Sequence, residues 1–280
     1  MSTSTTNPLA KHFRQPSIYL QLPSNGRFYP EGSIELSVTG EFPVYPMTVK
    51  DEISFKTPDA LMNGQGMADV IVSCCPNIKD PWSIPVIDLD PLLIAIRMAS
   101  YGPGMDITSD CPKCDSTNEN TVDLRGVLDS APPFNESKQT LEINTLMFEF
   151  KPQTYKDLNS SQQVLFEQQK ILNVVTDSTL TDEDKQQRFN ASFAKLTELN
   201  VNTLVICINS ITTEDNVRVT DSAFIKEFLS NTDRKTYDSI RNGIEDFVSS
   251  NAMAPIDITC SECSHTYKTK LEFNQSNFFE

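Results

Sequence analysis

The chain of 280 residues has little of what common enzyme and membrane classes depend on. Its two histidines, His12 and His265, are too few for histidine-dependent triads or histidine-rich zinc motifs. Walker loops, G-x-S-x-G and dinucleotide-binding glycine motifs do not occur. No stretch approaches the roughly 18 consecutive apolar residues of a membrane helix, and the N-terminus has no apolar signal core. We therefore expect a protein that is not an enzyme, has no membrane partner and is kept in a cytoplasm.

Basic residues are also scarce. The chain has 23 Lys and Arg against 38 Asp and Glu, for a formal net charge of −15, and the acidic excess runs through the whole sequence. Nucleic-acid affinity depends mostly on neutralising phosphates, so the composition argues against a nucleic-acid partner. The acidity is better suited to solubility or to a basic protein partner.

Seven cysteines are an odd number and too few for a disulfide scaffold of this length. Four of them form two Cys-x-x-Cys pairs, Cys111–Cys114 and Cys260–Cys263. Four thiolates in two short turns are the ligand set of a tetrahedral Zn²⁺ ion. Segments in which polar and apolar residues alternate flank each pair, and this pattern indicates a strand, a turn and a second strand. The pattern predicts a structural zinc site in a ribbon that residues 115–259 split in two.

Other interpretations of these cysteines stay open. One alternative is that the four thiols are reduced and bind no metal, and another is that the two pairs are redox centres. A third alternative is that His265 replaces one cysteine as a zinc ligand. Four thiolates, however, already fill a tetrahedron and leave no position for a catalytic water. The remaining cysteines lie in apolar contexts that favour small buried side chains; they are Cys74, Cys75 and Cys207.

The spacing of the apolar residues changes near Pro152, from a period of two residues before it to a period of about 3.6 residues after it. The fold class that this predicts is α+β, with a β-rich N-terminal part, a split zinc ribbon and an inserted all-α domain. The expected divisions are a mobile N-terminus (1–11), a β-rich domain with the first knuckle (12–151), a helical insertion (152–254) and the second knuckle (255–280).

Local signals predict individual elements within these divisions. Strands are expected at 17–22, 27–29, 34–38 and 44–49, and a hairpin over 141–150 around Asn144-Thr145. Helices are expected from Thr57-Pro58-Asp59 toward Cys75, and from a cap at Asp90 with Pro91 at the first helical position. In the insertion, a stripe at helical spacing predicts a buried face; its members are Phe189, Phe193, Leu196 and Leu199.

Several segments resemble one known family. They are His12–Pro16, Tyr19–Pro30, Tyr45–Glu52, Ile84–Asp90 before a helix and a Cys-Pro knuckle, and the terminal Asn277-Phe278-Phe279. This pattern resembles the baseplate hub and hub-assembly proteins of T-even-type tailed bacteriophages. The resemblance covers about residues 12–129 and returns at the second knuckle.

The resemblance implies a non-enzymatic hub component, or a chaperone of hub assembly, that binds other baseplate or tail proteins. Its location would be the host cytoplasm during assembly or the tail baseplate of the virion. The only functional residues that the resemblance carries are the knuckle cysteines. Stoichiometry and the hub partner stay open. A zinc-ribbon module that binds nucleic acid or serves transcription is the alternative, and an enzyme with a metal or thiol centre is a weaker one.

The segment from Phe13 to Tyr29 is the candidate docking element. We expect it to expose Phe13, Tyr19, Phe28 and Tyr29 within a short stretch rich in turns, and such aromatic residues anchor protein interfaces. The competing interpretation is that these aromatic side chains fold onto their own domain.

Overall fold

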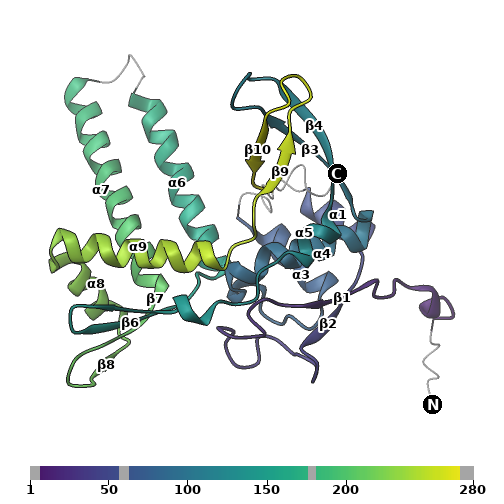
Figure 1. The fold of residues 1–280 in the computed structure, drawn as a ribbon, viewed down its shortest axis with the longest axis horizontal. Helices are drawn as coiled ribbons and strands as arrows, with labels where there is room; N and C mark the ends of the chain where they lie inside the picture. The colour runs from purple at the N-terminus through teal and green to yellow at the C-terminus, as the bar shows by residue number, and fades with distance from the viewer. Residues whose placement is uncertain (1–6, 57–62, 176–180, 272–280) are drawn as a thin grey trace.

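The computed structural model describes residues 7–56, 63–175 and 181–271. The expected cap at Thr57–Asp59 and the segment Asn277–Phe279 lie outside these ranges. The described chain forms two bodies of mixed helices and strands, with a pair of β-hairpins standing beside the first body (Figure 1). Within these ranges, no helix has the length and apolar character that crossing a membrane requires.

The first body is built around one buried helix, α4 (Val86–Tyr101). Leu92, Ile94 and Ile96 of this helix are fully buried, because neighbouring elements cover its whole circumference. Those elements are β1 (Ile18–Gln21), β2 (Glu41–Val44), α1 (Val49–Phe55), α3 (Gln65–Cys74), η2 (Pro81–Ser83) and α5 (Leu124–Asp129). The short turn η1 (Ala10–His12) precedes them in the chain and contributes no buried residue.

The second body is an antiparallel sheet in the order β5-β6-β7-β8, with helices packed on it. Ile240, Ile244 and Phe247 of α9 are buried in the same core as Phe148 and Phe150 of β6. Its elements are η3 (Glu136–Lys138), β5 (Thr140–Ile143), β6 (Leu146–Phe150), α6 (Tyr155–Val175), α7 (Asp182–Cys207), β7 (Ile208–Thr212), β8 (Arg218–Val219), α8 (Ser222–Asn231) and α9 (Arg234–Ser250).

Two antiparallel hairpins complete the fold. The first pairs β3 (Gly104–Asp110) with β4 (Thr117–Asp123), and the second pairs β9 (Ile256–Thr259) with β10 (Thr266–Thr269). They lie side by side although more than a hundred residues separate them in sequence (Figure 1). Each turn carries one Cys-x-x-Cys pair.

The predicted mixed fold of helices and strands is confirmed, but the insertion is not all-α. Helix α7 passes directly into strand β7 at Cys207–Ile208, and β8 follows. The apolar run Thr203–Ile211 is compatible with either structure, and β6 supplies the strand partner. The sheet therefore joins strands from both sides of residue 151.

Several local expectations were wrong. Residues 27–29 and 34–38 form turns and a single bridge from Ile34 to Ile78, not strands. Helix α4 begins at Val86, so Pro91 lies inside it. The predicted buried face on α7 is also wrong for Phe189 and Phe193, which are 48% and 64% exposed. The α6–α7 hairpin that carries them projects from the second body (Figure 1).

Candidate metal centre

The fold brings together the four cysteines of the two Cys-x-x-Cys pairs. Their sulfur atoms all lie within 4.8 Å of one another. Cys111 Sγ is 3.7 Å from Cys263 Sγ, and Cys114 Sγ is 3.6 Å from Cys260 Sγ. A tetrahedral ion with Zn–S bonds of about 2.3 Å sets its ligand sulfurs about 3.8 Å apart. A disulfide would hold two sulfurs at about 2.0 Å. The four thiols therefore fit one tetrahedral metal ion.

The two turns repeat the same backbone pattern. In the first, Asp115 N donates to Cys111 O (2.9 Å) and Cys111 N donates to Ser116 O (2.9 Å). In the second, Ser264 N donates to Cys260 O (3.0 Å) and Cys260 N donates to His265 O (2.9 Å).

The residue after each second cysteine adopts the same unusual backbone conformation. Asp115 and Ser264 have φ of 56° and 55°, a left-handed region that side chains other than glycine rarely adopt. The turns themselves, residues 111–116 and 260–265, share only their cysteines. The repeated backbone geometry therefore accompanies the Cys-x-x-Cys spacing, and it directs two sulfurs of each turn to one point.

Ser116 joins sulfurs from the two turns. Its hydroxyl lies 3.0 Å from Cys114 Sγ and 3.1 Å from Cys260 Sγ. Hydrogen bonding to Ser116 lowers the pKa of the Cys114 thiol and is the largest cause that lowers the pKa of Cys260 to about 5. Thiolates rather than thiols bind metal, so this serine favours the ligating form of both cysteines.

Cys263 shows the opposite behaviour. The backbone amide of His265 lowers its pKa, but burial and hydrogen bonds with the neighbouring cysteine sulfurs outweigh that effect and raise the pKa to about 12. Negative charge accumulates as the cluster ionises, so the last thiol resists losing its proton. A dication between the sulfurs would supply the charge that this arrangement lacks.

Asn118 of β4 is 3% exposed and locks the two turns together. Its Nδ2 donates to Ser116 O (2.9 Å), and its Oδ1 accepts from Ser261 N (2.9 Å) and Ser261 Oγ (3.1 Å). Tyr267 adds a second link, with its hydroxyl 2.7 Å from Ser109 Oγ. Neither Asn118 nor Tyr267 stands out as a functional residue in the sequence. Their signal is weak, because a polar residue in an alternating strand usually faces solvent.

The other metal and cysteine predictions have clear outcomes. His265 is outside the cluster, and its ring stacks against Tyr267 with centroids 6.4 Å apart. Cys74, Cys75 and Cys207 are buried as expected, and burial raises the pKa of each. Among the described residues, no second group of three or more metal-ligating side chains occurs.

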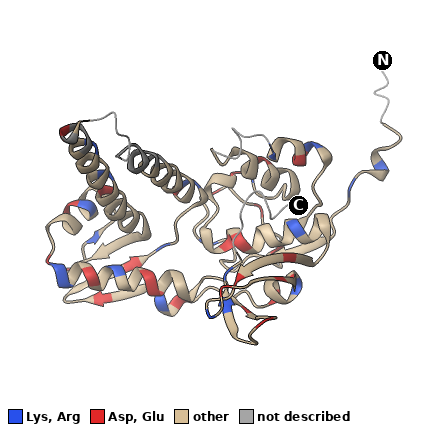
Figure 2. Cartoon of the chain, turned by 90° about the horizontal axis from the view of Figure 1, so that it is seen from above, with Lys and Arg blue, Asp and Glu red and all other residues tan. Residues whose placement is uncertain are grey.

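The two hairpins that carry the cysteines are acidic rather than basic. Residues 104–123 and 256–270 contain seven acidic residues against Lys113, Lys268 and Lys270. Along the rest of the described chain after residue 30, Lys and Arg are interspersed with Asp and Glu (Figure 2). This distribution gives no support to the nucleic-acid alternative.

The candidate docking segment divides into two parts. Phe13 and Tyr19 are 58% and 65% exposed. Phe28 instead packs edge-on against Phe134, with centroids 5.2 Å apart, and Tyr29 packs against the first core. The expectation that all four aromatic side chains are exposed is therefore wrong for the second pair, which follows the competing interpretation.

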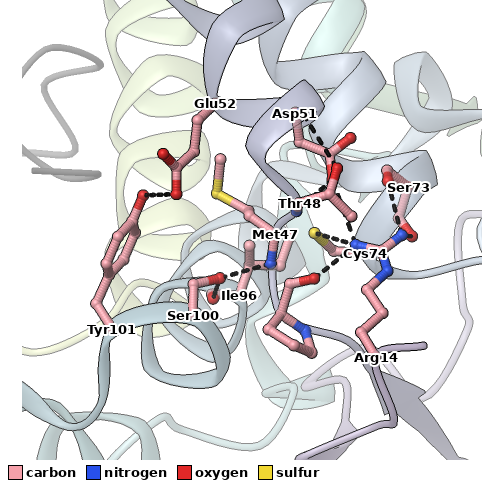
Figure 3. A network of polar contacts seen from close by, with 11 residues as sticks. Arg14, Met47, Thr48, Asp51, Glu52, Ser73, Cys74, Ile96, Ser100 and Tyr101 are labelled. Atoms are coloured by element: carbon pink, nitrogen blue, oxygen red, sulfur yellow. Dashed lines mark hydrogen bonds and ion pairs between the residues drawn. The ribbon is translucent and has the colours of Figure 1, made fainter. Parts of the chain in front are cut away.

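Arg14 holds this segment to the first body (Figure 3). Its Nη1 donates to Pro46 O (2.5 Å) and lies 3.3 Å from Asp51 Oδ2, and its Nη2 donates to Ser73 O (2.7 Å) and Ser73 Oγ (2.8 Å). Burial raises the pKa of Asp51, but hydrogen bonds from Thr48 and the Arg14 charge outweigh it, so the net pKa is lowered. Residues before Arg14 have no comparable attachment among the contacts described.

Comparison with known proteins gives one match. A family model described as "T4 bacteriophage base plate protein" matches residues 16–280, which is nearly the whole chain. No curated protein and no solved structure matches it.

Proposed function

Because the chain belongs to the T4 bacteriophage base plate protein family, we propose that it is a non-enzymatic baseplate hub component or hub-assembly chaperone. It acts by binding other tail proteins, and its fold includes a structural zinc ion. Membership of the family supports a structural part in the baseplate of the phage tail. The hub, the chaperone role, the binding mode and the host cytoplasm as the place of assembly are the finer parts of the proposal.

The closed cysteine cluster supports the structural and non-enzymatic parts of this proposal. Bound to one ion, the four protein sulfurs would complete a tetrahedron and leave no open position for water or substrate, and such closed sites are structural. Cys111, Cys114, Cys260 and Cys263 would hold the ion, and the metal would supply cross-linking of the two hairpins.

Zinc analysis of the purified full chain tests the cofactor. We expect about one zinc per chain, which Cys111→Ser should reduce to less than half. Cys207→Ala is the matched control, because Cys207 is also buried but lies outside the cluster. Absence of metal from undenatured protein would contradict the structural zinc. Iron in place of zinc, recognised by the visible absorption of an iron tetrathiolate, would support the metal site but contradict zinc as its metal.

A phage that lacks the gene tests the assembly role. We expect normal heads and few complete tails, with assembly restored by the wild-type gene and by Cys207→Ala. Normal tails without the gene would contradict the role. Mass spectrometry of purified particles then separates the two forms of the proposal, because a component stays in the virion and a chaperone leaves it.

Capture from infected-cell lysate tests the binding mode. A tagged chain should retain defined tail proteins at high salt and after nuclease treatment. Retention that nuclease abolishes would favour the nucleic-acid alternative and contradict binding through protein.

A further inference from the structure

Ser116 lies where the two hairpins meet at the cysteine cluster. It follows the first knuckle directly before β4, and its side chain is half-buried. Its carbonyl oxygen accepts hydrogen bonds from Cys111 N (2.9 Å) and from Asn118 Nδ2 (2.9 Å). These two bonds hold the backbone of the residue in place. The hydroxyl then lies 3.0 Å from Cys114 Sγ and 3.1 Å from Cys260 Sγ, so that it contacts one sulfur of each hairpin.

The hydroxyl of Ser116 has one proton to donate and two sulfurs within reach. Sulfurs that bind a metal are thiolates, which have no proton to donate in return. With an ion bound, the serine would therefore donate to one sulfur only. Cys114 is exposed, so water can donate to its sulfur, whereas Cys260 is only 2% exposed. A hydrogen bond from the protein is worth more at Cys260, because water cannot replace it there.

The contact between Ser116 and Cys260 also joins the two hairpins. Ser116 belongs to the first hairpin, and Cys260 begins the turn of the second. The hydrogen bond can form only when the two turns lie together, so it fixes the position of the Cys260 sulfur relative to the first pair of cysteines. Ser109 and Tyr267 make another link between the hairpins, with their hydroxyl oxygens 2.7 Å apart, but that link joins two oxygens and no sulfur.

We propose that Ser116 is a positioning residue of the metal centre, whose hydroxyl donates to Cys260 Sγ, places this sulfur for the ion and withdraws electron density from it. The inference rests on the structural zinc of the proposed function. It assigns to one serine an effect on the metal itself, in addition to any effect on the packing of the hairpins. Side chains that hydrogen-bond a metal ligand change metal affinity by about 10–100-fold.

Chelator competition on the purified full-length chain measures the effect on zinc affinity. Ser116→Ala should weaken zinc binding by about 10–100-fold, and Ser116→Thr, which keeps the hydroxyl, should restore most of the affinity. Ser109→Ala is the matched control. It also removes a half-buried serine hydroxyl that joins the hairpins, but through Tyr267 rather than through a ligand sulfur, and it should weaken zinc binding less.

Cobalt-loaded chains separate an electronic effect of Ser116 from a structural one. Co²⁺ bound by thiolates gives a sulfur-to-metal charge-transfer absorption, and a hydrogen bond that withdraws charge from a sulfur raises its energy. Ser116→Ala should therefore move this absorption to longer wavelength, and Ser116→Thr should return it. Ser109→Ala should leave it unchanged. Ser116→Val provides the comparison if the alanine variant does not fold, because valine has the shape of threonine without the hydroxyl.

The outcomes distinguish this inference from the zinc proposal on which it rests. Metal binding by Ser116→Ala with wild-type zinc affinity would overturn the role of the serine and leave the zinc site standing. So would a loss of affinity with an unchanged cobalt absorption, or an equal shift in Ser109→Ala, since the serine would then act through packing alone. A wild-type chain that binds neither zinc nor cobalt would overturn both proposals.

Discussion

Replacing Asn118 by alanine should weaken the candidate metal centre without touching a ligand. The change removes one hydrogen bond to Ser116 O and two from Ser261, all at 2.9–3.1 Å in a buried position. At about 1 kcal/mol for each bond, the loss is about 3 kcal/mol, or about two decades of equilibrium constant. Because Ser116 contacts two ligand sulfurs, we expect part of that loss to fall on metal affinity, by about 10–100-fold.

Chelator competition on the zinc-loaded chain measures this effect, and urea unfolding measures the accompanying loss of stability. Asn120→Ala is the matched control. Asn120 lies two residues along the same strand, but its Nδ2 is buried without a partner in the described structure, so its loss should be close to neutral. If the two variants release zinc equally easily, the idea that Asn118 supports the knuckles is refuted.

Two further predictions concern the cores. Burial raises the pKa of Asp88 to about 6, against hydrogen bonds from Ser24 that lower it. The pKa of an unfolded aspartate is about 3.9, so the folded chain is most stable below pH 4 and loses about 3 kcal/mol of stability as the pH rises through 6. Asp88→Asn does not ionise and should abolish this loss. Urea unfolding at pH 4 and pH 7 measures the difference for both chains. At Gly243, an added β carbon would lie 2.4 Å from Leu141 Cδ2 and 3.2 Å from the Phe150 ring. Overpacking of about 1–3 kcal/mol then exceeds the helix-propensity gain of about 1 kcal/mol, so Gly243→Ala should lower the melting temperature, whereas Gly126→Ala in open space should not.

Features set by residue type and short spacing could be predicted from the sequence. The four cysteines carry their ligand chemistry in their own side chains, and two-residue gaps place both sulfurs of a turn on one side. The predicted hairpin around Asn144 is confirmed, and it too depends on residue type and short spacing. Asn144 adopts φ of 56°, which asparagine tolerates better than most residues, and the strands beside it need no distant partner.

Features that depend on distant partners were missed. The chain begins α4 before the expected cap because the segment just before Tyr155 holds it there: Tyr155 N donates to Ile84 O, and Val86 N donates to Gln153 O. Pro91 has the residue type of a helix start but lies where tertiary contacts have already fixed the turn. Strand β7 likewise forms because β6, far earlier in the chain, supplies its hydrogen bonds.

The contacts around the candidate metal centre explain how the two hairpins can meet across such a long insertion. Closing a loop of residues 115–259 costs about 4–5 kcal/mol of chain entropy, on a logarithmic scale. Two other contacts already close most of it, from Lys151 N to Cys207 O (2.9 Å) and from Asn135 N to Asn251 Oδ1 (2.7 Å). The knuckles therefore have only short segments left to bring together.

The pair of hairpins is the part of the fold that a bound metal would stabilise most. Its buried core consists of Cys111, Ile258, Cys260 and Tyr267, whereas each of the two larger bodies has a core of a dozen or more buried side chains. Four residues bury too little apolar surface to hold two hairpins in register, and small units of this kind depend on a metal or a disulfide. Since two of the four are the proposed ligands, the same side chains would supply both the packing and the cross-link. Loss of the ion should therefore open the hairpins first, while the cores around α4 and the four-stranded sheet persist.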